Sequence, residues 1–158
     1  MSTSIIESIA QDVLATVNGV TVAAGYHQTL SGLRPPRLPG ADEAFDNNTV
    51  VLAQSNPTRD TDNSGMGNAA MLAWRQPFAL IAYVIASDSE TSSLDARINE
   101  VRSDLEKALM ADRTRGGYAI DTQILEPELF DFDPATTGII VMCEVFYRTR
   151  EDDPFTAA

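Results

Sequence analysis

The stretch "IIVMCEVFYRTR", residues 139–150, carries apolar side chains at both odd and even positions over most of its length. In a strand, successive side chains point to opposite faces of the sheet, so this segment is apolar on both faces. Such strands are typical of a central position, or of one that is covered on both sides. The stretch therefore predicts a chain organised around a sheet that holds this segment inside it.

A second long strand is predicted over residues 71–86, "MLAWRQPFALIAYVIA", because aromatic and β-branched residues dominate it. Pro77 interrupts this run. Proline has no N–H to donate to a neighbouring strand, so we expect the segment to lie at an edge or to contain a bulge at Pro77.

Three shorter strands are expected at residues 20–30, 49–54 and 118–125. In the third of these, polar and apolar residues alternate, which predicts one shared face. The residues of that face are Tyr118, Ile120, Thr122 and Ile124.

The N-terminal segment "IIESIAQDVLATV" has apolar residues at helical spacing. Ser4 and Glu7 form a capping-box pattern at its start, and Gly19 predicts its end.

A second helix is predicted from Leu94 to Leu109, with a capping pair at Ser92 and Asp95. Its apolar stripe consists of Leu94, Ile98, Val101, Leu105 and Leu109. The pairs Arg102–Glu106 and Asp104–Lys107 are expected on its solvent face.

The resulting order, α-β-β-β-α-β-β, predicts an α+β fold in one domain over residues 1–158. We expect a mainly antiparallel sheet of about five strands with two helices packed on one face. Long flexible loops are expected near 34–47 and 55–70, because prolines, glycines and polar residues replace any periodicity there. A polar tail is expected from residue 151.

The 158 residues carry a formal charge of −12, from 23 acidic and 11 basic residues. This charge disfavours non-specific nucleic-acid binding, which depends on lysine and arginine neutralising phosphates. Lys107 is the sole lysine, so no polybasic patch is available for an anionic membrane. No apolar run approaches the roughly 18 residues of a membrane-spanning helix, and we expect a protein that is made in and stays in the cytoplasm.

Cys143 is the sole cysteine and His27 the sole histidine. A buried, inert thiol and a catalytic nucleophile are the two alternatives for Cys143, and the second would need a histidine base. One cysteine and one histidine exclude an ordinary zinc site. No cofactor is expected.

The stretch "LMADRTRGGYAI", residues 109–120, raises the question of a phosphate-binding loop. Phosphate loops place glycines before a helix, at its positive end, whereas here the helix comes first. The alternative is a helix C-terminus, where Arg113 and Arg115 offset the negative end of the helix and Gly116 or Gly117 adopts a left-handed conformation.

Two acidic stretches are candidates for chemistry. "DTDNSG", residues 60–65, matches the first half of an EF-hand loop, but Met71 occupies the position of the bidentate glutamate, which favours a polar loop. "EPELFDFDP", residues 126–134, could hold an acid–base pair, but an acidic, solvated turn with Phe130 and Phe132 beneath it is the simpler interpretation.

The pattern as a whole resembles the tail terminator and minor tail proteins of long-tailed bacteriophages. The resemblance covers about residues 4–150. It lies in the element order, in "PFALIAYVIA", in "LDARINEVRSDLEKAL" followed by "MADRTRGGYAIDTQI", and in a closing strand that ends in an aromatic–basic pair, Tyr147–Arg148.

The resemblance implies a ring, typically of six copies, at the head-proximal end of the tail. Such a ring stops tube polymerisation, joins the tail tube to a neck or head completion protein, and lets DNA pass through its lumen without specific binding. These proteins are virion components that are assembled in the host cytoplasm, and they catalyse nothing.

Two groups of residues are candidates for these contacts. The candidate assembly loop, which we expect to order on contact with the tube, contains Arg59, Asp60, Asp62, Asn63 and Met66. The candidate channel-facing acids are Asp42, Glu43, Glu126, Glu128, Asp131 and Asp133. The alternatives are a head completion or neck protein of the same virion, a small cytoplasmic enzyme, and a binding module.

Overall fold

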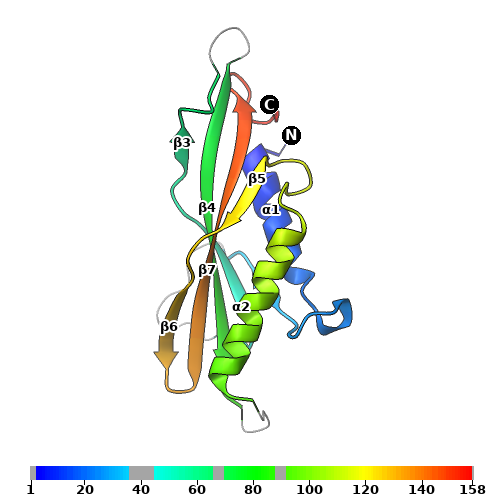
Figure 1. The fold of residues 1–158 in the computed structure, drawn as a ribbon, viewed down its shortest axis with the longest axis vertical. Helices are drawn as coiled ribbons and strands as arrows, with labels where there is room; N and C mark the ends of the chain where they lie inside the picture. The colour runs from blue at the N-terminus through cyan, green and yellow to red at the C-terminus, as the bar shows by residue number, and fades with distance from the viewer. Residues whose placement is uncertain (1–2, 36–44, 66–69, 88–91, 158) are drawn as a thin grey trace.

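The computed structural model describes residues 3–35, 45–65, 70–87 and 92–157. In these ranges the chain forms two α-helices and a mixed, mostly antiparallel sheet of seven strands (Figure 1). The α+β class is confirmed, but the expected count of about five strands is too low.

The elements have the following bounds. The helices are α1 (Ile5–Asn18) and α2 (Leu94–Ala111), and a short 3-10 helix, η1, covers Val22–Ala24. The strands are β1 (Ser31–Leu33), β2 (Thr49–Gln54), β3 (Thr58–Asp60), β4 (Met71–Ile85), β5 (Asp121–Ile124), β6 (Glu128–Asp133) and β7 (Thr136–Arg150).

Strands β4 and β7 are the centre of the sheet. They pair antiparallel over fifteen positions, from Met71 opposite Arg150 to Ile85 opposite Thr136. Both predictions of a long strand, and the prediction that the last one is central, are confirmed.

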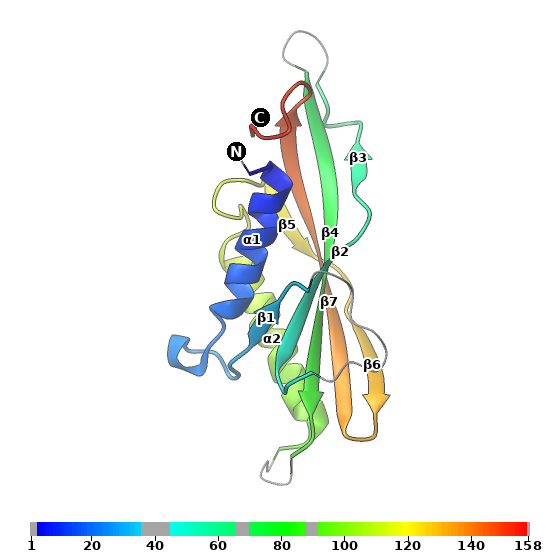
Figure 2. The ribbon, with the colours of Figure 1, turned by 180° about the vertical axis from the view of Figure 1, so that it is seen from behind.

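Short strands flank the two ends of this pair (Figures 1 and 2). At the end that contains Arg150, β3 pairs with β4, and β5 pairs with β7. At the end that contains Thr136, β2 pairs with β4 and β6 with β7, while β1 runs parallel to β2. We call these the Arg150 end and the Thr136 end of the sheet.

The expected edge position of Pro77 is confirmed only locally, because β4 as a whole lies between other strands of the sheet. Strand β2 ends opposite Phe78 and β3 begins opposite Arg75, so no strand pairs with β4 on that side at Pro77. The Pro77 carbonyl accepts a hydrogen bond there from the Ser55 N–H (3.1 Å). Because N–H and C=O of one strand residue point to the same side, the missing N–H falls in the gap between β2 and β3.

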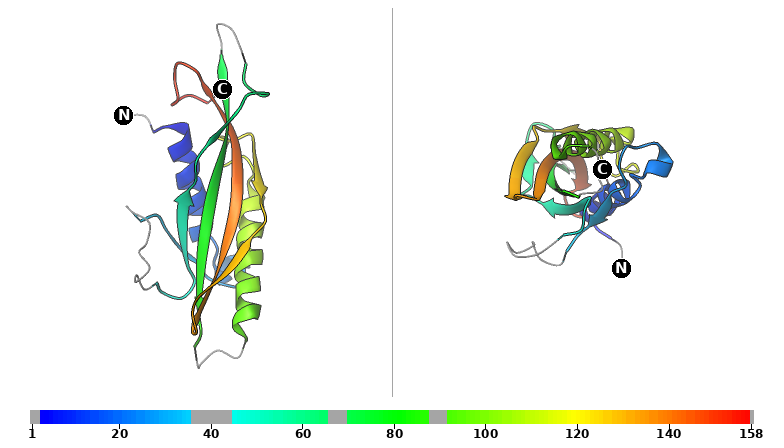
Figure 3. Two further views of the ribbon diagram at one scale, coloured as in Figure 1. Left: turned by 90° about the vertical axis from the view of Figure 1, so that its left-hand side faces the viewer. Right: turned by 90° about the horizontal axis from the view of Figure 1, so that it is seen from below.

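Both helices cover the same face of the sheet (Figures 1 and 3). The strands direct alternate residues toward them, among them Phe78 and Leu80 of β4 and Val141 and Val145 of β7, all fully buried. Burial of this kind stabilises the fold by about 1.5–3 kcal/mol for each large apolar side chain. We call the opposite side of the sheet the outer face.

The helix predictions are confirmed with two corrections. The N-cap of α1 is Ser4, whose hydroxyl accepts from the Glu7 N–H (3.3 Å). The cap of α2 is Ser93, one residue after the expected Ser92. Asp104 is buried at 1% exposure and does not pair with Lys107 on the solvent face. Instead it accepts from the Gln28 N–H (2.8 Å).

On the outer face, aromatic rings gather at the Thr136 end. Phe45 stacks on Tyr83 with 4.5 Å between ring centroids, and Phe130 and Phe132 meet the same ring edge-on. Opposite Phe130 in the strand ladder lies Gly138, where a Cβ atom would overlap the Phe130 ring. The glycine therefore makes room for the aromatic cluster.

Several local predictions are wrong. Residues 20–30 form η1 and a turn, because Gly25 adopts a left-handed conformation (φ 87°). The acidic segment 126–134 contains strand β6 where a turn was expected. The strand predicted over 118–125 is confirmed only as β5; Tyr118 and Ile120 precede it and are exposed.

The loops and the tail differ from each other. Most of the predicted loop near 34–47 lies outside the described residues, although Arg34 is described and forms an ion pair with Glu7 (2.8 Å). The tail from residue 151 folds back on the chain, since Ala157 bridges to Thr149 and the Pro154 carbonyl accepts from the Ile5 N–H.

Candidate functional site

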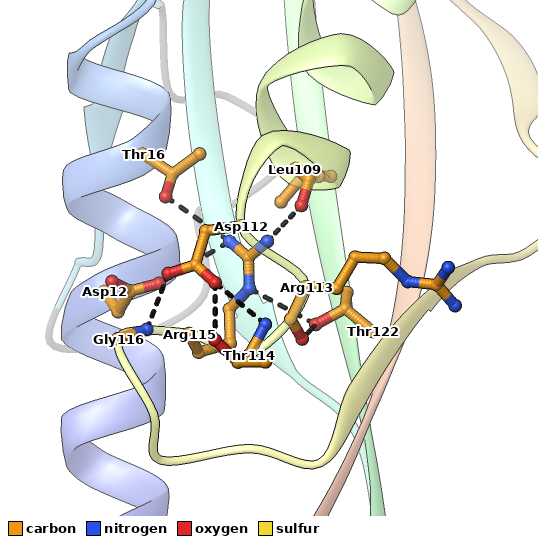
Figure 4. A network of polar contacts seen from close by, with 9 residues as sticks. All are labelled: Asp12, Thr16, Leu109, Asp112, Arg113, Thr114, Arg115, Gly116 and Thr122. Atoms are coloured by element: carbon orange, nitrogen blue, oxygen red, sulfur yellow. Dashed lines mark hydrogen bonds and ion pairs between the residues drawn. The ribbon is translucent and has the colours of Figure 1, made fainter.

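The turn that follows α2, residues 112–117, is closed by its own polar contacts (Figure 4). Three consecutive residues have positive φ: Arg115 (51°), Gly116 (66°) and Gly117 (88°). The expected left-handed glycines are confirmed. The left-handed arginine was not expected, since a side chain makes this conformation costly.

The Asp112 carboxylate accepts hydrogen bonds from the backbone amides of this turn. It accepts from the Thr114 N–H (2.9 Å), the Thr114 hydroxyl (2.7 Å) and the Gly116 N–H (2.7 Å). The Thr114 hydroxyl, followed by the Gly116 and Thr114 amides, lowers the pKa of Asp112 to about 2. The amides that a phosphate loop would offer are already bound, which favours the helix-end alternative.

Arg115 links three elements from a fully buried position (Figure 4). Its guanidinium donates to the Leu109 carbonyl in the last turn of α2 and to the Thr122 hydroxyl of β5 (3.2 Å). On the side of α1 it faces Asp12 (3.5 Å) and Thr16 (3.4 Å). The predicted offset of the helix end is therefore confirmed for Arg115.

Arg113 pairs with Asp121 of β5, whereas it was expected to offset the C-terminal end of α2. Its side chain is half exposed and forms a bidentate pair with Asp121 of β5, at 2.7 and 2.8 Å. The Arg113 hydrogen bonds lower the pKa of Asp121. Burial raises the pKa of Asp12, although the charge of Arg115 acts against this shift.

Cys143 is fully buried, and burial raises the pKa of its thiol to about 12. A thiol in this state does not supply a thiolate nucleophile near neutral pH, which confirms the inert alternative. His27 is bound elsewhere. Its Nδ1 lies 3.0 Å from the Asp104 carboxylate, and its side chain is 68% exposed.

The candidate assembly loop is already partly ordered in the single chain. Arg59 and Asp60 belong to β3, and the Asp60 carboxylate accepts from the Asn63 side chain (3.0 Å) and from Arg75 (3.2 Å). The Asn63 hydrogen bond, with Arg75 assisting, lowers the pKa of Asp60. That the loop orders on contact with the tube stays a prediction.

Of the other candidate residues in this loop, two are described and one is not. Asp62 and Asn63 are exposed, and Met66 lies outside the described residues. The EF-hand match has no support here, because Asp60 is held by Asn63 and Arg75. Among the described residues, no group of three or more His, Cys, Asp or Glu side chains is placed to hold a metal ion.

A pocket of about 190 Å³ opens at the Arg150 end of the sheet. Its lining includes Asp60, Asn63, Ala73, Asp121, Phe146 and Arg148. Arg148 is the feature of this pocket that sequence reasoning missed. Its Nε atom is buried and has no hydrogen-bond acceptor. The sequence marked it only as half of an aromatic–basic pair.

The candidate channel-facing acids lie on and beside β6. Glu126, Glu128, Asp131 and Asp133 are all exposed, and Asp133 accepts from the Ala135 N–H in the turn to β7 (2.7 Å). Asp42 and Glu43 lie outside the described residues. The same strand exposes large apolar side chains, with Leu129 at 65% and Phe132 at 41%.

No protein-family model matches the chain, and comparison with curated proteins gives no match. No helix among the described residues is both long enough and apolar enough to span a bilayer.

Substituting Arg115 tests its structural role, and Arg113 provides a matched control two residues away. We expect Arg115→Ala to lower the free energy of unfolding by about 3 kcal/mol, because it leaves the Leu109 carbonyl and the Thr122 hydroxyl without their donor. Arg113→Ala removes an exposed pair and should cost at most about 1 kcal/mol. Chemical denaturation measures both; equal losses would contradict the role of Arg115.

The Asp112 contacts predict a pH dependence. We expect Asp112→Ala to cost about 1 kcal/mol at neutral pH, as for other carboxylates that cap backbone amides. The pKa of Asp112 is lower in the folded chain than in the unfolded chain. The stabilisation by its carboxylate is therefore present above about pH 4 and is lost as the pH falls toward 2. The stability difference between wild type and variant should shrink over that range. A difference that stays constant down to pH 2 would count against the assignment.

Proposed function

We propose that this chain is a structural virion protein similar to the tail terminators of long-tailed bacteriophages. In this proposal, copies form a ring, typically six-fold, that caps the tail tube and stops its polymerisation. The ring then joins the tail to a neck or head completion protein. The work is done by binding surfaces and not by catalysis.

The observation that carries the proposal is the free edges of β3 and β6, two of the four strands in the described sheet that pair on one side only. Strands β3 and β6 each pair on one side and lie at opposite ends of the molecule (Figure 1). A free edge exposes unpaired N–H and C=O groups that can bind another chain. Two different edges on one chain suit a head-to-tail contact, the kind that closes into a ring.

The exposed side chains of β6 support the same proposal. Leu129 and Phe132 stand on the surface of a strand that otherwise carries acids. Exposed apolar side chains along a free edge are a feature of surfaces that become buried in an assembly. The chain charge of −12 suits a ring through which DNA passes without adhering.

Tube capping tests the function directly. Tube protein of the same virus is polymerised with and without the purified chain, and tube lengths are measured by electron microscopy. We expect rings at the tube ends and shorter, more uniform tubes. Light scattering after size exclusion should show association of the chain with the tubes.

The phenotype of a null mutant distinguishes a tail terminator from a neck protein. A terminator null should give tails of uncontrolled length, whereas a neck protein null should give normal tails beside unjoined heads. Tubes that elongate normally in vitro, together with tails of normal length in the null, would reject the terminator role.

The acids at the start of β6 provide a further test within this function. In the proposal, Glu126 and Glu128 face the channel and repel DNA phosphates. Virions with Glu126→Gln and Glu128→Gln should eject DNA more slowly than wild type, with Glu106→Gln on α2 as the matched control. Equal ejection rates in wild type, in the virions with Glu126→Gln and Glu128→Gln, and in the Glu106→Gln control would exclude a channel position for Glu126 and Glu128.

A further inference from the structure

The described arginines and lysine are almost all engaged within the chain. Arg34, Arg75, Arg102, Arg113 and Arg150 form ion pairs with acids. Arg97, Arg115 and Lys107 donate to backbone carbonyls. In the ranges that the structure describes, this leaves Arg59 and Arg148 without a hydrogen-bonded or ion-paired partner.

Both unpaired arginines lie at the Arg150 end of the sheet. Arg59 is exposed on β3, and Arg148 lines the pocket with its Nε atom buried and unsatisfied. The two acids of the pocket do not neutralise Arg148, because Asp60 is bound by Arg75 and Asp121 by Arg113. A partly buried cation without a partner is costly, so a carboxylate from outside would be bound favourably here.

The rest of the pocket suits an aliphatic side chain. Ala73 is small and lies between Asp60 of β3 and Arg148 of β7 in one row across the strands. The Phe146 ring adds an apolar wall, and the Arg75 guanidinium covers it at 4.5 Å from the ring centroid. The pocket therefore combines apolar surface from Ala73 and Phe146 with polar groups and a free cation.

The chain itself carries the complementary pair at the Thr136 end. On β6, alternation puts Leu129 and Asp131 on one side, away from Glu128 and Phe130. Leu129 is 65% exposed, and Asp131 is exposed with no partner among the described residues. An exposed leucine and, two residues later, an unpaired carboxylate match the apolar surface and the free cation of the pocket in kind.

We propose that β6 of one copy docks on the Arg150 end of the next copy, with Leu129 in the pocket and Asp131 against Arg148. The free edge of β3 then gains a neighbouring strand. Because the two surfaces lie at opposite ends of one chain, the contact is head-to-tail and repeats from copy to copy. This inference rests on the proposed ring, whose subunit contact it specifies.

Charge reversal tests the contact. Arg148→Glu and Asp131→Arg should each weaken self-association by about tenfold or more, measured by sedimentation over a concentration series. Arg148→Glu combined with Asp131→Arg in one chain should recover most of the loss, since every contact then holds a reversed pair. Arg102→Glu, on the exposed face of α2, is the matched control and should associate like wild type. Asp131 is an exposed strand residue, so the Asp131→Arg variant serves if Arg148→Glu fails to fold.

Disulfide capture gives a second measurement. Arg148→Cys with Asp131→Cys should give a ladder of cross-linked multimers on oxidation, whereas each single variant should stop at dimers. The native thiol does not interfere, because Cys143 is fully buried. Arg148 pairs with Ala73 at the Arg150 end and Asp131 with Thr137 at the Thr136 end, so a bond within one copy is excluded.

The outcomes of these experiments distinguish the proposed contact between copies from the proposed terminator role. Capped tubes without a ladder, and with charge variants that associate like wild type, would overturn the contact and leave the terminator role. A ladder and charge rescue without capping would support the contact and reject the role. A wild type that stays monomeric and a double-cysteine variant that gives no ladder at any concentration would overturn the contact.

Discussion

Fifteen consecutive residue pairs join β4 to β7, and the rest of the described sheet is built on this ladder. Strands β2, β3, β5 and β6 each hydrogen-bond to one of the two, and β1 is added through β2. The ladder also fixes which residues face the helices, because alternation carries one face of each strand into the core along its whole length. A shift of one residue would move the side chains of one strand to the opposite face, so this register determines which residues of β4 and β7 are exposed.

A second determinant of the fold is the buried guanidinium of Arg115. Arg115 lies where α1, α2 and β5 meet, and its donors reach a group on each of these elements. An arginine suits this position because its planar guanidinium presents five donors in fixed directions. The helix end, the following turn and the first residues of β5 are thus held together by one side chain, which lies outside every apolar pattern in the sequence.

Regular patterns in the sequence were sufficient for the large elements. The apolar runs of β4 and β7 and the stripes of α1 and α2 predict their positions, because burial on one or both faces dictates the spacing. The pattern failed where burial is polar or where pairing is local. Asp104 looks like a surface charge on a helix but is buried beneath residues 27–28, to which it is hydrogen-bonded. Strand β6 looks like an acidic turn because acids and prolines flank its apolar residues, and its pairing with β7 is not visible in the local pattern. The pocket could not be foreseen, since Ala73 and Arg148 are 75 residues apart in the sequence and meet only through the register.

The position of the break at Pro77 has a mechanical consequence. Strand β2 stops and β3 starts near the middle of β4, and β5 gives way to β6 near the middle of β7. The two gaps lie at different levels of the ladder: β5 still pairs with β7 opposite Pro77, through Gln123 and Glu144, and β2 still pairs with β4 where β5 gives way to β6. At least three strands therefore cross the sheet at each gap. The missing donor of Pro77 does not create a hinge, because hydrogen-bonded strands on the other side of the ladder span the gap.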